Sequence, residues 1–289
     1  PMPDELTPHF QEVQAHYDLS DDFFRLFLDP TMTYSCAYFD RRRNITLEQA
    51  QLAKIDLSLA KLGLQPGMTL LDVGCGWGST MRRAVEKYDV NVVGLTLSKH
   101  QAVHVQKMLD ELDTERTGRV LLHGWEEFDE PVDRIVSIGA FEHFGYDRYD
   151  DFFEKAYGIM PEDGVLLLHS ITRLTPKQLA EKELAMSEEW VSFSEFIAAE
   201  IFPGGQLPPI EMVEFHASKA EFILNRRQSL RLHYARTLDL WAEALSAHHV
   251  EAVKIQSEEV YQRYMRYLTG CAQAFREGYI DVNQFTLTK

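Results

Sequence analysis

The sequence contains few cysteines. Its 289 residues include only Cys36, Cys75 and Cys271, an odd number spread widely along the chain. Cysteines in this pattern suit neither a disulfide framework nor a zinc site, so we expect no bound metal. A chain without disulfides fits a reducing compartment by default, and we therefore expect a cytoplasmic protein.

Long apolar runs are also missing. The longest lies around Val165–Leu168 and is far shorter than the ~20 residues that span a bilayer. The segment from Pro1 to Phe10 has neither a basic start nor an apolar centre, so we expect no signal peptide. These features predict a soluble protein without a transmembrane segment.

Basic residues are scarce, because 29 Lys and Arg face 45 Asp and Glu and leave a net charge of -16 at pH 7. Nucleic-acid binding depends on neutralising phosphates with Lys and Arg, so a DNA or RNA substrate is disfavoured. An acidic membrane would repel the chain on average, although a local basic patch could still make peripheral contact. The obvious patch is Arg41-Arg42-Arg43, and a run that short is more often a solvated loop.

Two helical segments are expected near the N-terminus. The first runs from Phe10 to Asp29 with a break at which Ser20 could cap its second half. The second runs from Thr46 to Leu62, begins with a Thr46–Gln49 capping box and ends at Gly63.

Short apolar strands then alternate with helical patterns, one of which starts at a capping Ser98. This alternation predicts an α/β fold with a parallel sheet that is covered on both faces. The predicted strands are Thr69–Val73, Val90–Leu97, Val120–Leu122, Arg134–Ile138 and Gly164–His169.

The segment from Thr175 to Ala217 interrupts this alternation. It is mostly helical, and we interpret it as an insertion over the binding edge of the sheet. Phe222–Leu230 and Asn283–Thr288 would be late strands that close the sheet, with one long helix from Ala235 to about Phe275 between them.

We expect a single domain, because no repeat or long Gly/Ser linker divides the chain. Its expected parts are an N-terminal helical cap (1–68), a cofactor-binding core (69–171), a helical substrate insertion (172–217) and a C-terminal helix with closing strands (218–289).

The most informative motif is Leu70-Leu71-Asp72-Val73-Gly74-Cys75-Gly76-Trp77-Gly78, in which a strand runs into closely spaced glycines. Glycines let a backbone approach a ligand closely, although a purely structural loop is the alternative. The spacing is shorter than the dinucleotide motif G-x-G-x-x-G. Asp72 suits the cationic end of S-adenosylmethionine better than a pyrophosphate. No carboxylate follows the second strand, which argues against a common NAD enzyme; there, Gln101 could bind ribose hydroxyls.

Across essentially the whole chain, the sequence resembles the mycolic acid cyclopropane synthases, a methyltransferase family that also includes enzymes installing methyl, methoxy-precursor and hydroxyl groups. The resemblance implies a Rossmann-like class I S-adenosylmethionine-dependent methyltransferase with a mostly parallel seven-stranded sheet, helices on both faces and a helical lid. Besides the glycine motif, the matching blocks are His16–Phe24, Thr33–Phe39, Gly94–Ser98, Gly124–Glu126, Phe141–Phe144, Ile201–Gly205, His233–Leu238 and Tyr267–Cys271.

The resemblance also implies site residues and two small molecules. S-adenosyl-L-methionine would contact Tyr34, Ser35, Asp72, Val73, Gly74, Cys75, Gly76, Trp77, Gly78, Thr96, Leu97, Gln101, Trp125 and Glu126. A bicarbonate ion would act as base, held by Cys36, Glu142, His169 and Tyr234 and by the backbone at Ile138. Cys271 is catalytic only by analogy within the family, because nothing else in the sequence singles it out.

The implied reaction is methyl transfer to a carbon–carbon double bond of a long mycolic acid precursor. The resulting carbocation would lose a proton and close a cyclopropane, and the rings of Tyr17, Tyr34 and Phe144 could stabilise it. Taken singly, each proposed bicarbonate ligand has a structural explanation: a buried thiol for Cys36, a core histidine for His169 and a helix cap for Glu142. Their joint occurrence in matching blocks favours a site.

Three alternatives stay open. Capture of water by the cation would give a hydroxyl product, a small amine or phenol could be the acceptor, and an inactive chain could serve as a lipid-binding module. A substrate carried by an acidic acyl carrier protein would be repelled by the acidic helix at Ser187–Phe196. The Arg41–Arg43 patch could then provide the docking charge. The sequence leaves the oligomeric state undetermined.

Overall fold

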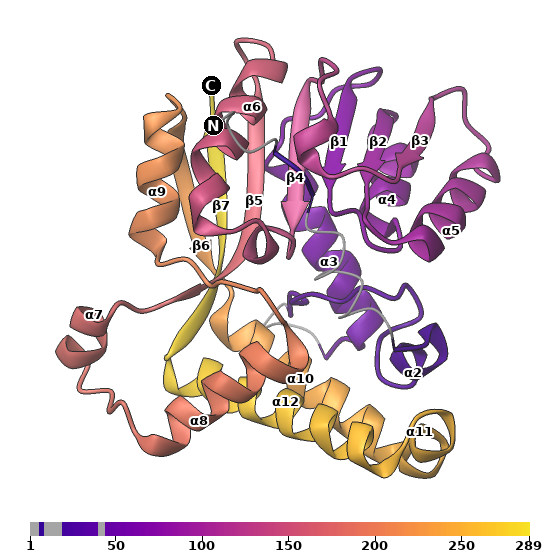
Figure 1. Cartoon of the computed structure of the whole chain (residues 1–289). Coiled ribbons are helices and arrows are strands. Elements are labelled where there is room, and N and C mark those ends of the chain that lie inside the picture. Colours follow the sequence, from indigo (N-terminus) through magenta and orange to yellow (C-terminus); the bar gives the residue numbers. More distant parts are fainter. Residues whose placement is uncertain (1–5, 9–18, 40–43) are drawn as a thin grey trace.

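Seven strands form one sheet in the computed structural model, which describes residues 6–8, 19–39 and 44–289 (Figure 1). Their order across the sheet is β3-β2-β1-β4-β5-β7-β6, and all neighbours are parallel except those of β7, which is antiparallel to both β5 and β6. The predicted α/β fold, with a mostly parallel seven-stranded sheet, is therefore confirmed. The strands are β1 Thr69–Val73, β2 Asn91–Leu95, β3 Gly118–Leu121, β4 Arg134–Ile138, β5 Val165–Arg173, β6 Ile223–Ser229 and β7 Ile280–Thr288.

Helices cover both faces of the sheet because successive strand residues point to opposite sides. On one face, α3, α4 and α5 pack in a cluster that includes Leu70 and Leu167, whereas α6 and α9 pack on the other face with Leu71 and Leu166. These helices are α3 Leu47–Ala60, α4 Ser79–Tyr88, α5 Lys99–Asp110, α6 Tyr149–Ile159 and α9 Ile210–Lys219.

A third layer of helices lies beyond the carboxyl ends of the strands (Figure 1). All of its helices except α7 contribute to a core cluster that includes Phe27, Trp241 and Leu268. Its members are α2 Asp21–Arg25, α7 Pro176–Glu181, α8 Glu188–Phe196, α10 Arg231–Ala247, α11 His249–Ile255 and α12 Glu258–Glu277, and a π-helical turn at Ile197–Ile201 continues α8.

The helix caps expected from the sequence are present. The Ser20 side chain accepts a hydrogen bond from the amide of Phe23, and Thr46 and Gln49 form the capping box of α3. Ser98 likewise caps α5. The first half of the predicted helix from Phe10, and with it Tyr17, lies outside the described residues, as do Arg41 to Arg43.

Two predicted elements, the C-terminal helix and the strand Gly164–His169, were wrong in detail. The expected long helix from Ala235 is three helices, and α10 and α12 lie side by side (Figure 1). The breaks at His248 and Gln256 contain neither glycine nor proline, so no helix-breaking residue marks them, although Ser257 caps α12. Strand β5 also continues past His169, because β7 pairs with it as far as Arg173.

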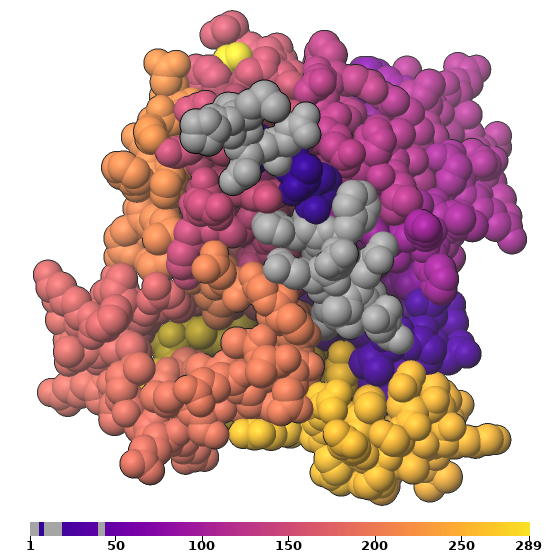
Figure 2. Space-filling view, viewed as in Figure 1, coloured from indigo at the N-terminus to yellow at the C-terminus, as the bar shows by residue number. Residues whose placement is uncertain are grey.

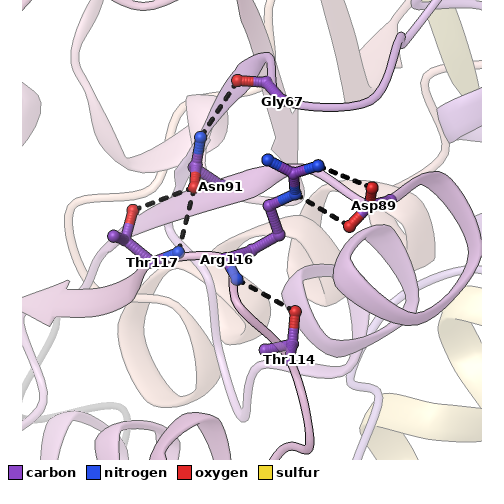
Figure 3. A network of polar contacts seen from close by, with 6 residues as sticks. All are labelled: Gly67, Asp89, Asn91, Thr114, Arg116 and Thr117. Carbon is purple, nitrogen blue, oxygen red and sulfur yellow. Dashed lines mark hydrogen bonds and ion pairs between the residues drawn. The ribbon is translucent and has the colours of Figure 1, made fainter.

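The amino ends of β2 and β3 are tied to the turn before β1 by a polar network at the edge of the sheet (Figure 3). Asn91 donates to the carbonyl of Gly67 over 3.0 Å and accepts from the amide of Thr117 over 2.9 Å. Beside it, Arg116 makes two hydrogen bonds of 2.8 and 2.7 Å to Asp89. This network holds the three strands in register at the end opposite the glycine loop.

Among the described helices, none is long and apolar enough to cross a bilayer.

Candidate active site

The loop between β1 and α4 has a backbone that favours glycine. Gly74, Gly76 and Gly78 have φ angles of +78°, +54° and +84°, in the left-handed region. The amides of Gly74 and Cys75 donate to the carbonyl of Leu95 over 3.0 and 2.9 Å. These bonds fix the loop across the carboxyl ends of β1 and β2, where open α/β sheets bind ligands.

A cavity of about 180 Å³ lies over this loop, and we call it the cofactor cavity. Apart from Gly78, every residue predicted to contact the cofactor lines it. These residues are Tyr34, Ser35, Asp72, Val73, Gly74, Cys75, Gly76, Trp77, Thr96, Leu97, Gln101, Trp125 and Glu126.

Gly78 has a different position. It precedes the first residue of α4, and a Cβ built on it would lie 2.8 Å from Cε of Met108 and about 3 Å from the methyl groups of Val105. The structure therefore gives this glycine a packing role, because it lets α4 start close against α5.

Polar side chains at the end of β2 and after β3 are held in place by their neighbours. Gln101 accepts a 2.7 Å hydrogen bond from the hydroxyl of Thr96 through its amide oxygen, which leaves its amide N–H groups for other acceptors. Glu126 forms an ion pair of 3.0 Å with Arg148. The predicted ribose-binding residue is therefore a buried, oriented donor.

A buried lysine also lines the cofactor cavity, and sequence reasoning missed it. Lys54 is only 1% exposed, and its ammonium donates to the hydroxyl of Ser35 over 2.5 Å. Burial lowers the pKa of Lys54 to about 8. Burial raises the pKa of Asp72 to about 7, while the charge of Lys54 acts in the opposite direction. Lys54 thus favours the anionic form of Asp72.

Lys54 belongs to a polar stripe on α3 and the turn after it, formed by Gln51, Lys54, Ser58 and Lys61. Gln51 and Ser58 are fully buried, and Gln51 donates to the carbonyl of Ser35 over 2.8 Å. The spacing of three, four and three residues places these side chains on one helical face. Such spacing next to apolar positions is the signal that could have identified them.

A larger cavity of about 480 Å³, here named the acyl cavity, adjoins the cofactor cavity. Apolar side chains from the insertion form much of its wall, among them Trp190, Phe193 and Phe202. In the space-filling view the surface is hollowed beside the insertion, with atoms of the C-terminal part visible inside (Figure 2). The volume of the acyl cavity falls within the range of pockets that enclose small organic ligands.

The acyl cavity brings together most of the predicted catalytic residues. Its lining includes Cys36, Glu142, His169, Tyr234 and Cys271. Ile138 lines the cofactor cavity instead, but it pairs directly with His169 across β4 and β5.

Glu142 is a buried carboxyl group with one free oxygen. Its Oε1 accepts a 2.7 Å hydrogen bond from the amide of Ile171 in β5, whereas Oε2 is buried without a partner. This contact ties Glu142 to β5, so the alternative that it only caps a helix does not describe its position. Burial raises its pKa to about 7, so near neutral pH a large share of the carboxyl groups carries a proton.

Cys36, Tyr234 and Cys271 of the acyl cavity remain protonated. Burial raises the pKa of Cys36 and of Tyr234, and it raises the pKa of Cys271 to about 12. Because a thiolate is the reactive form of cysteine, these thiols are poor nucleophiles. Tyr234 can instead donate a hydrogen bond to an anion, and Cys36 can do so when its S–H turns away from the carbonyl of Ala37, which lies 3.2 Å from Sγ.

A family model described as mycolic acid cyclopropane synthetase matches residues 4–285. The chain belongs to this family. It is therefore an S-adenosylmethionine-dependent methyltransferase, as the resemblance implied.

The similarity to individual members extends over the full length. The chain is 70% identical over 288 residues to cyclopropane mycolic acid synthase MmaA2 of Mycobacterium tuberculosis, and the match covers 100% of both chains. The solved structure of that cyclopropane synthase matches with a TM-score of 0.97 at 71% identity, over 99% of this chain and 100% of the other. The crystal structure of mycolic acid cyclopropane synthase CmaA1 complexed with SAH and CTAB matches with a TM-score of 0.96 at 67% identity, with the same coverage.

In this methyltransferase, α8 covers the acyl cavity with an apolar face and turns acidic residues outward. Trp190 stacks on Tyr279 with ring centroids 4.3 Å apart, and the ring of Phe193 lies where a Cβ on Gly270 would be. Glu188 and Glu189, in the first turn of the helix, are exposed. The outer surface of the lid is therefore acidic.

Proposed function

We propose that this synthase transfers a methyl group from S-adenosylmethionine to a double bond of a long mycolic acid precursor and closes a cyclopropane ring with bicarbonate as base. The observation that carries the proposal is that the two cavities meet, since Tyr34, Ser35, Gly139 and His143 line both. A cofactor in one cavity would face an acyl chain in the other. Both SAH and CTAB, a surfactant with one long alkyl chain, accompany the related CmaA1 chain in its crystal structure.

The walls of the acyl cavity suit this chemistry. An isolated alkene is a weak nucleophile, so its π face must be held close to the methyl sulfonium and away from water. The aromatic and aliphatic wall can hold the alkyl chain and exclude water. Tyr34 packs against Phe24 and Trp241 at centroid distances of 5.4 Å each, and its ring can stabilise a nearby cation.

Four neutral or protonatable groups suit a small anion in the same cavity. Cys36, Tyr234 and His169 can donate to it, and the unpartnered Oε2 of Glu142 can donate when it carries a proton. Bicarbonate, when bound there, supplies a base that is less easily alkylated than a carboxylate side chain. One C–C bond forms in methyl transfer; ring closure forms a second as the new methyl group loses one proton, for a net gain of CH₂.

The proposal extends to how the substrate arrives. We infer that the acyl chain is presented by an acyl carrier protein in the cytoplasm, and that Arg41 to Arg43 offer the docking charge because the lid surface is acidic. Replacing all three arginines by glutamate should raise KM for carrier-bound substrate and leave KM for the cofactor unchanged. Unchanged kinetics with both substrates would rule out this docking site.

Mass spectrometry tests the reaction directly. A long-chain alkene, lipid-bound or carrier-bound, is incubated with methyl-labelled S-adenosylmethionine, and a gain of CH₂ is the expected result. A gain of CH₃ and OH would show that water captures the cation, as in the hydroxylating alternative. No gain despite tight cofactor binding would refute lipid methylation for that substrate and favour a small acceptor or an inactive lipid-binding module.

Bicarbonate is tested by removing carbon dioxide from the same assay. Product formation should fall in the depleted buffer and recover when bicarbonate is added back. Glu142→Gln should weaken this recovery, whereas Glu162→Gln, at a side chain that is 96% exposed, should not. Full activity without bicarbonate would exclude it as the base.

A further inference from the structure

His169 lies in a row of side chains that crosses three strands. It pairs directly with Gln284 on β7, and Gln284 pairs with Gln228 on β6. Nδ1 of His169 lies 3.2 Å from Nε2 of Gln284, so Nε2 is the only ring nitrogen left for the acyl cavity. We propose that Gln284, oriented by Lys61 and Ser58, fixes His169 as the neutral tautomer with its proton on Nε2.

Lys61 determines which way the Gln284 amide faces. Its Nζ lies 2.5 Å from Oε1 of Gln284 and 2.7 Å from Oε1 of Gln228. An ammonium group can only donate, so the atoms that face it must be amide oxygens. Burial and the charge of Arg226 lower the pKa of Lys61 to about 8. A neutral amine still has two hydrogens, so both bonds persist after deprotonation.

Ser58 gives the same orientation independently. Its hydroxyl donates to the carbonyl of Lys54 over 2.8 Å, which uses its only hydrogen. At the 3.0 Å contact between Ser58 Oγ and Gln284 Nε2, the glutamine must therefore be the donor. The second hydrogen of that amide nitrogen points to His169, so Nδ1 of His169 is an acceptor.

The charge state of His169 agrees with this arrangement. Burial lowers its pKa well below the ordinary value, and the charges of Lys54 and Lys61 act in the same direction. A neutral histidine with an acceptor at Nδ1 carries its only proton on Nε2. The ring therefore presents an N–H to the acyl cavity, and Gln284 and Lys61 are positioning residues that touch neither substrate nor cofactor.

The purpose of this N–H, to hold the anion, rests on the proposed function, whereas the tautomer itself does not. A lone pair on Nε2 would repel an anion, so a fixed donor removes the unfavourable tautomer. Since one hydrogen bond to a charged group contributes about 1.5–3 kcal/mol, loss of the donor should raise the half-saturating bicarbonate concentration about tenfold or more.

Nitrogen-15 NMR of the full chain tests the tautomer, with the His169 signals assigned by their loss in His169→Gln. We expect a protonated Nε2 and an unprotonated Nδ1 in the wild type. Gln284→Glu replaces the donor by a carboxylate and should move the proton to Nδ1. Gln228→Glu is the matched control: it adds the same charge beside Lys61, one strand farther from His169, and should leave the tautomer unchanged.

The outcomes separate the two proposals. A proton on Nδ1 in the wild type, or an unchanged tautomer in both Gln284→Glu and Gln284→Met, would overturn the inference whatever the activity. A tautomer that shifts as expected while the bicarbonate dependence stays the same would leave the hydrogen-bond chain intact and refute the anion site. If Gln284→Glu fails to fold, the wild-type spectrum and Gln284→Met decide.

Discussion

Replacing Lys54 by methionine should make the protein more stable and bind the cofactor less well. Lys54 is buried and lacks a carboxylate partner within salt-bridge distance among the described residues, so its charge is poorly compensated. Each pKa unit corresponds to about 1.4 kcal/mol, so lowering its pKa from 10.5 to about 8 means that the ammonium costs the folded state about 3 kcal/mol at pH 7. Losing the bond to Ser35 offsets about 1 kcal/mol of this. The net gain should be about 2 kcal/mol.

The pH dependence of this effect has a definite sign. Between pH 8 and 10.5 the folded wild type has released the Lys54 proton while the unfolded chain still holds it. Stability of the wild type relative to Lys54→Met therefore rises as pH increases through this window. Below pH 8 the difference should be constant and should favour the variant.

The weaker cofactor binding expected of Lys54→Met follows from the protonation of Asp72. Without the nearby positive charge, its pKa should rise above the value of about 7 that it has in the wild type. A protonated Asp72 cannot attract the cationic end of the cofactor, so the Kd for S-adenosylmethionine should increase at pH 7 and recover at pH 9.

Urea unfolding of the cofactor-free protein at pH 7 and pH 10, together with calorimetric titration of the cofactor, would measure both effects. Lys107→Met, at a side chain that is 77% exposed, is the control and should change stability by less than about 0.5 kcal/mol. A destabilised Lys54→Met variant with unchanged cofactor affinity would refute the reasoning.

Three further predictions concern other parts of the site. Gly78→Ala should destabilise the protein by about 2–4 kcal/mol through backbone strain and crowding against α5. Gly76→Ala, with no atom within 4 Å of its new Cβ, should cost only the backbone strain. Thermal unfolding compares the two variants, and equal losses of stability would contradict the packing role of Gly78. Glu142→Gln should become up to about 3 kcal/mol more stable relative to the wild type as pH rises from 4.5 to 7, because burial raises the pKa of the carboxyl group to about 7. Urea unfolding that gives the same stability difference between variant and wild type at both pH values would exclude this. Gly270→Ala should displace Phe193 and with it the lid helix α8. KM for the acyl substrate should then rise while cofactor affinity stays constant. An unchanged KM would show that the position of the lid does not depend on this contact.

Local signals in the sequence were sufficient for the fold. The capping box at Thr46 and Gln49 and the apolar strand from Thr69 to Val73 each determine the structure of their own neighbourhood, so they could be recognised without tertiary information. The long helix predicted after Ala235 was wrong because α11 is separated from its neighbours by packing against α2 and α12 rather than by a helix-breaking residue.

Residues of the candidate site could be predicted only where they lie in sequence blocks that match the family. The spacing of Lys54, Ser58 and Lys61 places them on one helix face, but the burial of Lys54 and Ser58 and the contacts of Ser58 and Lys61 with Gln284 depend on tertiary packing against β7. Gln284 is equally inconspicuous, since its importance comes from its pairing with His169 across two strands that are distant in sequence. The roles of the predicted site residues remain predictions that the experiments above address.

The position of β7 has a consequence for how the enzyme is made. This strand follows every other described element along the chain, yet it lies between β5 and β6 in the sheet. While the ribosome is still translating α12, a nascent chain can assemble β1 to β5, but β5 then has an open edge that could pair with another chain. Tyr279, Ile280 and Gln284 are also still missing, so the wall of the acyl cavity is incomplete and His169 lacks its partner. Each polypeptide therefore acquires its activity only with the last strand, and the interval before that is when it is most exposed to aggregation.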